Sequence, residues 1–225
     1  MITYDTTGGG ADPDGGDGPL TYNLTIGSGE NRILIVGVRL FSNLTSNPIS
    51  SVTFNGVGLT KITDSTIGGN QFWLAIYYLV NPDSGTHAVS VNYPNGNNTY
   101  ITSAAAAYSG ADQVNPIDAF ATKGLDSAGQ TTMSHNVTTT VDNCWVFGFF
   151  YAAGGSISLT GATSRTVADT YTVCGDSNEP ITPAGSKTMS YTFSSSTYVL
   201  MGLISFKPVS SSSASLGGSF LMNFT

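Results

Sequence analysis

The histidines are the first residues of this sequence from which acid–base chemistry would be expected. There are two, His87 and His135, and both fall in segments with a β-strand pattern. A serine hydrolase places a histidine beside an activated serine, and the Gly-x-Ser-x-Gly turn that presents the serine in one large hydrolase class does not occur. We therefore expect both histidines to be structural.

The two glutamates, Glu30 and Glu179, stand beside the turn-forming residues Gly29 and Pro180. Glycoside hydrolysis requires two carboxyl groups that flank the scissile bond. Acidic side chains in surface turns are mostly solvated. Neither the two histidines nor the two glutamates predict catalysis. We therefore expect that the protein is not an enzyme.

Asp12, Asp14 and Asp17 lie in a glycine-rich segment and are weak candidates for a metal site. Ca²⁺ prefers several carboxylate oxygens on a bendable backbone. The spacing departs from the 1, 3, 5 pattern of a calcium loop, and position 12 of that loop would be Asn23 instead of a glutamate. A solvated acidic linker is favoured, and no cofactor is expected.

Two cysteines, Cys144 and Cys174, each fall in an apolar strand-like run. A disulfide between them is geometrically feasible, but two separate buried thiols are favoured because free cysteine behaves as a small apolar residue. Neither cysteine belongs to a Cys-x-x-Cys or a Cys/His spacing, so a zinc site is not predicted.

The composition limits the partners of the chain. Charged residues make up 9% of the 225 residues, against about 25% in an ordinary soluble domain. The net charge of −7 disfavours nucleic acid, whose phosphates need clustered Lys and Arg. The first residues lack the features of a signal peptide, and no stretch approaches the ~20 apolar residues of a membrane span. We expect neither nucleic acid nor membrane as a partner, and synthesis without a signal peptide.

The elements that must position these residues are β-strands, since no segment has a sustained helical period. Asn55-Gly56 predicts a two-residue hairpin, because both central positions need positive φ. The predicted strands cover residues 20–26, 33–41, 51–54, 57–62, 72–80, 87–93 and 100–109, and then 131–139, 144–152, 165–173, 189–193 and 198–206.

One strand pattern occurs twice, in the same order. The segment around Gly37 matches that around Gly148 at an offset of 111, the segment after Gly85 matches that after Gly185 at 100, and Tyr100-Ile101 matches Tyr198-Val199 at 98. Each set of strands alone would leave an apolar face uncovered. We therefore predict one all-β domain, a two-sheet antiparallel sandwich that is jelly-roll-like and built from two similar halves, residues 19–110 and 131–208.

Residues 33–41 and 145–151 are apolar on both strand faces. A strand that is buried on one side alternates apolar with polar residues, so both runs must be covered twice. Loops of the same chain or another subunit could cover them, and this pattern predicts a homo-oligomer, most simply a trimer.

Both ends of the sequence differ from the body. Residues 1–18 predict a short strand followed by a flexible Gly/Asp segment, residues 19–208 form the sandwich, and residues 209–225 are a Ser/Gly linker with an apolar end. Large apolar side chains are unfavourable in water, and we predict that those at the end of the tail dock on a neighbouring subunit or partner. They are Phe220, Leu221, Met222 and Phe224.

Three runs resemble a β-sandwich module of phage virion proteins and bacterial surface proteins: residues 31–38, 52–60 and 78–87. The resemblance spans roughly residues 19–208 and implies a jelly-roll-like domain on a particle surface, with no functional residue carried over. We therefore expect a decoration (cement) protein on the capsid exterior of a tailed phage, bound to the major capsid protein or another virion protein. The alternative is a carbohydrate- or receptor-binding module of a tail fibre or bacterial surface protein, in which exposed aromatics such as Tyr77, Tyr78, Tyr93 and Tyr100 could stack on sugar rings.

Overall fold

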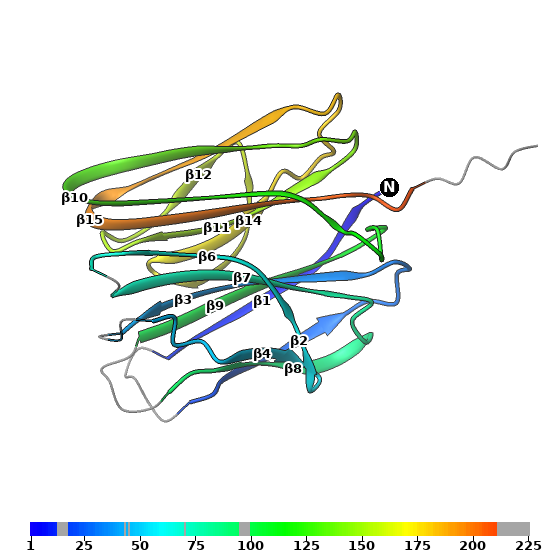
Figure 1. The fold of residues 1–225 in the computed structure, drawn as a ribbon, viewed down its shortest axis with the longest axis horizontal. Helices are drawn as coiled ribbons and strands as arrows, with labels where there is room; N and C mark the ends of the chain where they lie inside the picture. Colours follow the sequence, from blue (N-terminus) through cyan, green and yellow to red (C-terminus); the bar gives the residue numbers. More distant parts are fainter. Residues whose placement is uncertain (13–17, 43, 45, 70, 95–99, 211–225) are drawn as a thin grey trace, which may run out of the picture.

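The apolar runs form β-strands in a computed structural model that describes residues 1–12, 18–42, 44, 46–69, 71–94 and 100–210. Every regular element among these residues is a strand, and each pairs antiparallel with its neighbours (Figure 1). The predicted all-β antiparallel sandwich is confirmed. The strands are β1 (Thr3–Asp12), β2 (Leu20–Ile26), β3 (Ile33–Phe41), β4 (Ser51–Phe54), β5 (Val57–Gly58), β6 (Thr60–Ile67), β7 (Phe72–Val80), β8 (Gly85–Asn92), β9 (Tyr100–Ser109), β10 (Ile117–Thr138), β11 (Trp145–Ala152), β12 (Ser158–Thr160), β13 (Thr163–Asp169), β14 (Thr172–Asp176) and β15 (Ser186–Phe206).

The first half of the chain is a jelly roll. One sheet has the order β1-β9-β3-β7-β6 and the other has the order β2-β8-β4-β5. Two interleaved Greek keys produce this order, and β6 is an additional edge strand. The core between the sheets contains Leu34, Val36, Phe54 and Val89, all fully buried.

The second half repeats this order with fewer and longer strands. β10-β15-β11-β14-β13 form its inner sheet. β10 and β15 continue past register shifts between Asp126 and Thr132, and their far portions form the outer layer together with β12. Met133, Met189 and Tyr191 of this outer layer pack on Val146 and Phe150 of β11.

The duplication is therefore present, but its register differs by one residue from the sequence match. Gly37 pairs with Ala104 and Ile76, and the residue with the corresponding partners is Phe149, which pairs with Gly202 and Cys174. The offset of β3 to β11 is 112 (149 − 37), the same as between Asn31 and Asn143, which both have positive φ (54° and 65°).

The match of Gly37 with Gly148 is wrong because a slip of one residue turns a strand side chain to the opposite face. A Cβ on Gly148 would meet Phe150 and Leu203 in the core of its own half. A Cβ on Gly37 would meet the ring of Phe149 in the other half. The two glycines lie in corresponding central strands but on opposite faces.

A repeated β-bulge is a second feature that the two halves share. Register shifts occur at Asp5 in β1 and at Asp118 in β10. The Asp5 carboxylate accepts a hydrogen bond from the backbone N–H of Gly27, and that of Asp118 accepts one from the N–H of Thr140. Asp118 follows Asp5 by 113 residues, and Thr140 follows Gly27 by the same number (118 − 5 and 140 − 27). The same bulge and the same hydrogen bond therefore occur in each half.

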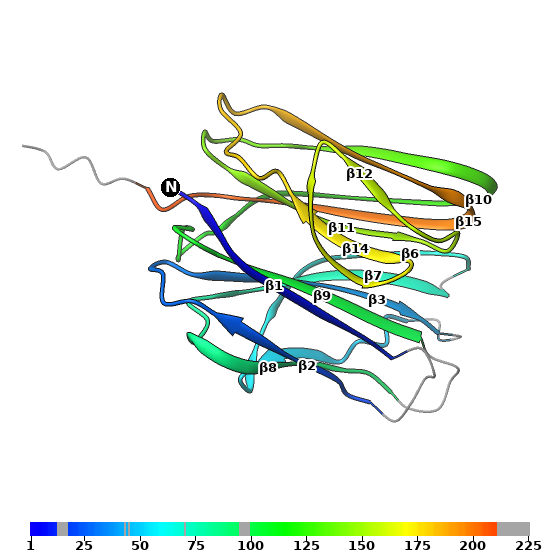
Figure 2. The same ribbon diagram turned by 180° about the vertical axis from the view of Figure 1, so that it is seen from behind.

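The two halves stack inner sheet to inner sheet, so that the sandwich has four layers instead of the predicted two (Figures 1 and 2). A third apolar cluster fills the space between the inner sheets, with Ile35 and Ile76 from one half and Phe147, Phe149 and Ile204 from the other. β1 packs on β13, and its counterpart β10 packs on β6. This reciprocal contact is the pattern of a two-fold symmetric dimer, here within one chain.

This stacking covers the second faces of β3 and β11. Leu34 and Val36 point into the core of the first half, and Ile33 and Ile35 point into the layer between the halves. The apolar pattern on both faces of these strands is therefore satisfied inside one chain, and it no longer argues for another subunit.

Several element boundaries differ from the prediction. β1 continues through Gly8, Gly9 and Gly10 to Asp12, where a flexible segment was predicted, because β2 and β9 approach this strand closely: a Cβ on Gly9 would lie 2.8 Å from the Ser103 carbonyl oxygen. β10 begins at Ile117, inside a predicted loop. The predicted strand 165–173 is instead a hairpin between β13 and β14. The hairpin at Asn55-Gly56 is confirmed, with φ of 49° and 76°.

Candidate functional site

The residues weighed for catalysis do not converge. Among the described residues, no hydrogen bond or ion pair joins any two of His87, His135, Glu30 and Glu179. His87 Nε2 lies 3.1 Å from the Ser84 carbonyl oxygen, and its ring stands edge-on to Phe54. Burial lowers the pKa of His135, and the nearby Lys123 lowers it further. The glutamates are exposed.

The cysteines are two separate buried thiols. Cys174 pairs with Phe149 across β14 and β11, whereas Cys144 precedes β11 by one residue. Cys174 is therefore level with Phe149, which follows Cys144 by five residues of extended chain, or roughly 16 Å. A disulfide allows only about 7 Å between Cα atoms. Burial raises the pKa of Cys144 to about 11 and that of Cys174 to about 12.

Of the weak metal candidates, the structure describes Asp12 only, at the end of β1; Asp14 and Asp17 lie outside the described residues. The Asp12 carboxylate accepts a hydrogen bond from the Tyr93 hydroxyl at 3.0 Å. Within the described part of the chain, no three His, Cys, Asp or Glu side chains are grouped as metal ligands.

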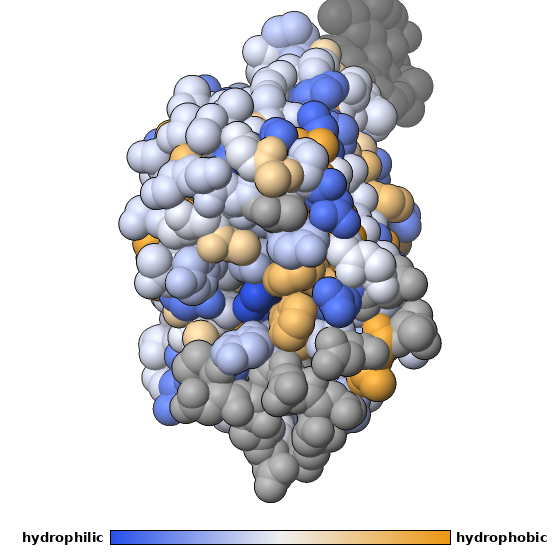
Figure 3. All heavy atoms as spheres, turned by 90° about the vertical axis from the view of Figure 1, so that its left-hand side faces the viewer, coloured by the Kyte–Doolittle hydropathy of each residue, from blue (hydrophilic) through white to orange (hydrophobic). Residues whose placement is uncertain are grey.

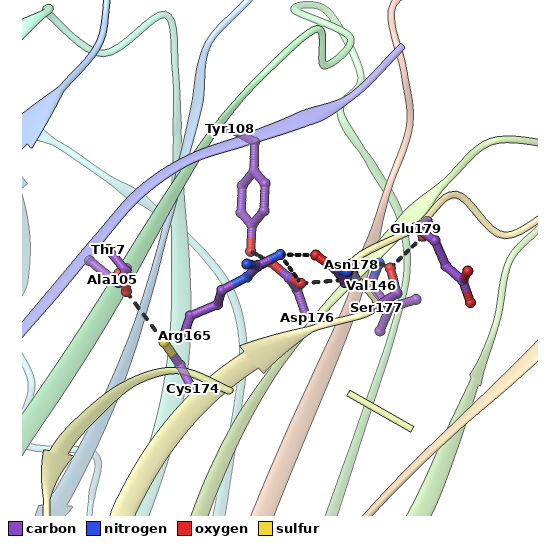
Figure 4. Close-up of polar contacts among 10 residues, drawn as sticks. All are labelled: Thr7, Ala105, Tyr108, Val146, Arg165, Cys174, Asp176, Ser177, Asn178 and Glu179. Atoms are coloured by element: carbon purple, nitrogen blue, oxygen red, sulfur yellow. Dashed lines mark hydrogen bonds and ion pairs between the residues drawn. The ribbon is translucent and has the colours of Figure 1, made fainter. Parts of the chain in front are cut away.

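A charged cluster is buried where the two halves meet (Figure 4). The fully buried Asp176 carboxylate accepts hydrogen bonds from Arg165 Nε at 2.8 Å and Nη2 at 2.9 Å, and from the Tyr108 hydroxyl at 2.9 Å. The Arg165 guanidinium also lies 3.9 Å from the ring centroid of Tyr4. Burial raises the pKa of Tyr108 well above its usual value.

This cluster is structural. Arg165 and Asp176 belong to the second half, Tyr4 and Tyr108 belong to the first, and every carboxylate oxygen has a partner. A buried ion pair is favourable when its charges are fully hydrogen-bonded. The cluster fixes the two jelly rolls relative to each other.

A pocket of about 520 Å³ lies between the two halves at the end where β1 terminates. This volume is within the range of small-molecule sites. Figure 3 looks onto this end of the molecule, where a small apolar patch lies among polar side chains. Aromatic rings from both jelly rolls line the pocket: Phe41, Phe72 and Tyr100 from the first, and Tyr151 and Tyr171 from the second.

Arg39 supplies the positive charge of this pocket. It lies on β3 and is only 8% exposed, because Leu74 and Thr102 flank it on the neighbouring strands. Its guanidinium carbon is 4.2 Å from the ring centroid of Tyr151, and Nη2 donates to the Tyr151 hydroxyl at 2.9 Å. Nε is buried and has no partner. In the described part of the chain, no carboxylate forms an ion pair with Arg39.

Carboxylate acceptors line the same pocket, and Asp169 is held there by Thr102, the residue that pairs with Arg39 on the adjacent strand. The Asp169 carboxylate accepts hydrogen bonds from Thr102 Oγ1 at 2.6 Å and from the backbone N–H of Tyr171 at 2.8 Å. These contacts hold the carboxylate in place while each oxygen retains a further lone pair. Asp12 also lines the pocket.

Sequence reasoning identified one part of this pocket and missed another. Of the tyrosines considered for stacking on sugars, Tyr77 and Tyr93 are buried and Tyr78 is half-buried, whereas Tyr100 is 46% exposed and lines the pocket. Arg39 was missed, although a lone arginine in the apolar run 33–41 was a visible signal.

The opposite end of the molecule carries exposed apolar side chains. Met1, Val141 and Val209 are 84%, 41% and 39% exposed and line a second hollow of about 490 Å³. Val114, 85% exposed, lies on a loop whose Asp112 N–H bonds to the Lys207 carbonyl beside this hollow. The tail residues predicted to dock, Phe220, Leu221, Met222 and Phe224, lie outside the described residues.

Comparison with known proteins gives no relative: no protein-family model matches the chain, and no curated protein matches its sequence. Among the described residues, no helix is long and apolar enough to cross a membrane.

Proposed function

We propose that this chain is a structural protein of a tailed-phage particle, of the capsid-decoration kind, and that it acts through protein–protein contacts without catalysis. The observation that carries the proposal is the apolar end defined by Met1, Val114, Val141 and Val209. Exposed apolar side chains that gather on one face are typical of docking surfaces. On a capsid exterior this end would face the major capsid protein, and burial of apolar area would stabilise the head at roughly 25 cal/mol per Å².

Occupancy on the particle tests this orientation. Val114→Asp and Val141→Asp each place a charge in the proposed contact, whereas Val57→Asp introduces the same charge at a 50% exposed position on β5. Particles assembled with the first two variants should carry at least tenfold fewer copies than wild type, and those with Val57→Asp should be unchanged. Equal occupancy for all three variants would contradict attachment through this end.

A trimer is part of the proposal and is supported by the edges of the inner sheet of the second half. Phe120 on β10 and Val167 on β13 are 54% and 63% exposed at opposite edges of that sheet. Head-to-tail contacts between opposite edges generate a closed ring when the rotation between neighbouring subunits closes. Light scattering should give about 70 kDa, three times the chain mass of 23.3 kDa. A single species at the chain mass at micromolar concentration would exclude the trimer for the isolated protein.

The second candidate is a receptor-binding module of a tail fibre or bacterial surface protein. The aromatic pocket at the opposite end favours it, because ligand sites are concave and combine apolar walls with a few polar groups. The jelly roll is found in both capsid proteins and lectins, so the fold does not separate the two candidates.

A further inference from the structure

The pocket between the jelly rolls contains a buried cation that forms no ion pair with a carboxylate of the described residues. Arg39 is nine-tenths buried, its Nε has no partner, and its one hydrogen bond among the described residues is to the neutral hydroxyl of Tyr151. A buried charge that is not fully paired is costly. An anion bound in the pocket would remove this cost.

We propose that this pocket binds an acidic saccharide, with the sugar carboxylate placed against the Arg39 guanidinium. The planar guanidinium matches a carboxylate in shape and charge. A small inorganic anion would fill little of about 520 Å³, whereas a sugar residue would use the pocket walls as well.

The walls of the pocket fit the remainder of a sugar. Tyr100 and Tyr171 are 46% and 43% exposed at the pocket and come from different jelly rolls. Aromatic faces of this kind bury the apolar C–H surface of a sugar ring while the tyrosine hydroxyls stay in water. The Asp169 carboxylate, fixed by Thr102 and by the Tyr171 N–H, accepts hydrogen bonds from sugar hydroxyls.

The arrangement of charges also sets the specificity. The Arg39 cation and the carboxylates of Asp12 and Asp169 line the same pocket, and Asp169 is held by Thr102, which pairs with Arg39 on the adjacent strand. A ligand must therefore present one anionic group to Arg39 and neutral hydroxyls to the aspartates. A saccharide with more than one charge on each sugar, such as a sulfated one, would be repelled by the aspartates and by the net charge of −7. The inference concerns the end opposite the proposed attachment surface and does not depend on it.

Titration calorimetry with the full chain tests the proposal. The probes are oligogalacturonate, its methyl ester, which has the same shape without charge, and a sulfated oligosaccharide of equal length. We expect oligogalacturonate to bind at least tenfold more tightly than its ester. Tighter binding of the sulfated probe than of oligogalacturonate would contradict the assignment of a sugar carboxylate to Arg39. Equal binding of ester and acid, or no heat with either acidic probe at millimolar concentration, would overturn the proposal.

Variants locate the binding. Tyr171→Ala and Tyr100→Ala alter exposed side chains and should each weaken oligogalacturonate binding about tenfold, whereas Phe120→Ala removes an equally exposed ring on β10 and should have no effect. Arg39→Lys keeps the charge but loses the planar fork, and it should reduce the preference for the acid over its ester. If Arg39→Lys does not fold, the tyrosine variants decide alone: binding unchanged in both would place the ligand elsewhere and refute the proposal.

Discussion

Gly37 and Phe149 occupy the same position in the two halves of the chain, and they lie against each other. A Cβ on Gly37 would overlap Cδ2 of Phe149. In a two-fold symmetric assembly, a residue near the axis contacts its own counterpart. Two phenylalanines would clash at this place and two glycines would leave a void. The two halves therefore differ at this position, because identical residues could not pack against each other there.

The Gly37–Phe149 contact predicts that Gly37→Ala is destabilising. The added methyl group overlaps a fully buried ring, and overpacking of this kind costs about 1–3 kcal/mol. Urea unfolding measures the loss. Gly58→Ala, which adds a methyl group in open space on β5, is the matched control and should change stability by less than about 0.5 kcal/mol. Adding Phe149→Leu to Gly37→Ala should restore part of the stability; strict additivity of the two losses would argue against this contact.

Asp176→Asn should be among the most destabilising single substitutions. It removes the negative charge opposite Arg165, whose side chain is 13% exposed and, among the described residues, keeps only the hydrogen bond to Asn178 Oδ1, and the loss should be about 3 kcal/mol, the lower end of the range for a broken buried pair. Lys61→Ala breaks the surface ion pair with Asp64 and should cost less than about 1 kcal/mol. Chemical denaturation compares the two variants. Similar losses in both would mean that the buried cluster does not hold the two halves together.

The thiols should be inert in the folded protein. With pKa values of about 11 for Cys144 and about 12 for Cys174, the thiolate fraction at pH 8 is on the order of 10⁻³ or less, and both sulfurs are buried. Ellman's reagent should titrate no thiol at pH 8 and two after unfolding in guanidinium. Ser210→Cys, at an exposed position, should add one thiol that reacts at once. Rapid reaction of the native thiols before unfolding would contradict their burial.

The bulge carboxylate of Asp118 should make stability depend on pH in the acid range. Burial raises its pKa, but the hydrogen bonds from Thr140 and Ser205 outweigh this and the pKa is lowered overall. Because the folded pKa lies below the unfolded value of about 3.8, its contribution is present at neutral pH and is lost as pH falls below about 4.

Asp118→Asn is the corresponding test. At pH 7 the variant should be less stable than wild type by about 1–3 kcal/mol, the usual range for hydrogen bonds to a charged group. The difference should shrink toward zero near pH 2, where the wild-type carboxyl is protonated as well. A difference that stays constant from pH 7 to pH 2 would show that the charge of Asp118 is not responsible.

The local pattern of apolar and polar residues predicted the strands. It could not predict how strands that are distant in the sequence pack together. The runs around Ile35 and Phe147 were recognised as covered on both faces, but nothing in the pattern shows that each covers the other. The sequence match aligned Gly148 with Gly37 because both are glycines. The register of a strand is set instead by which of its faces is buried, and this criterion aligns Gly37 with Phe149. The positive-φ pair Asn31 and Asn143 would have given the correct offset.

The candidate site was less predictable than the fold for a physical reason. The pocket combines residues from β1, β3, β7, β9 and β11 with the β13–β14 turn, and these segments meet only after the two jelly rolls have packed together. A lone arginine such as Arg39 in an apolar strand signals a buried charge. Its hydrogen-bond partner Tyr151 and the pocket residue Asp169 are more than 100 residues away in the sequence.

Immunogold electron microscopy of particles produced by the genome that encodes this chain tests the central claim most directly. Antibodies against the purified protein should label the heads of intact particles at many sites, because a decoration protein covers the capsid exterior. Label confined to tail fibres would replace the capsid proposal with the receptor-binding one. Intact particles that carry no label, from a lysate in which the protein is detected, would contradict a virion role altogether.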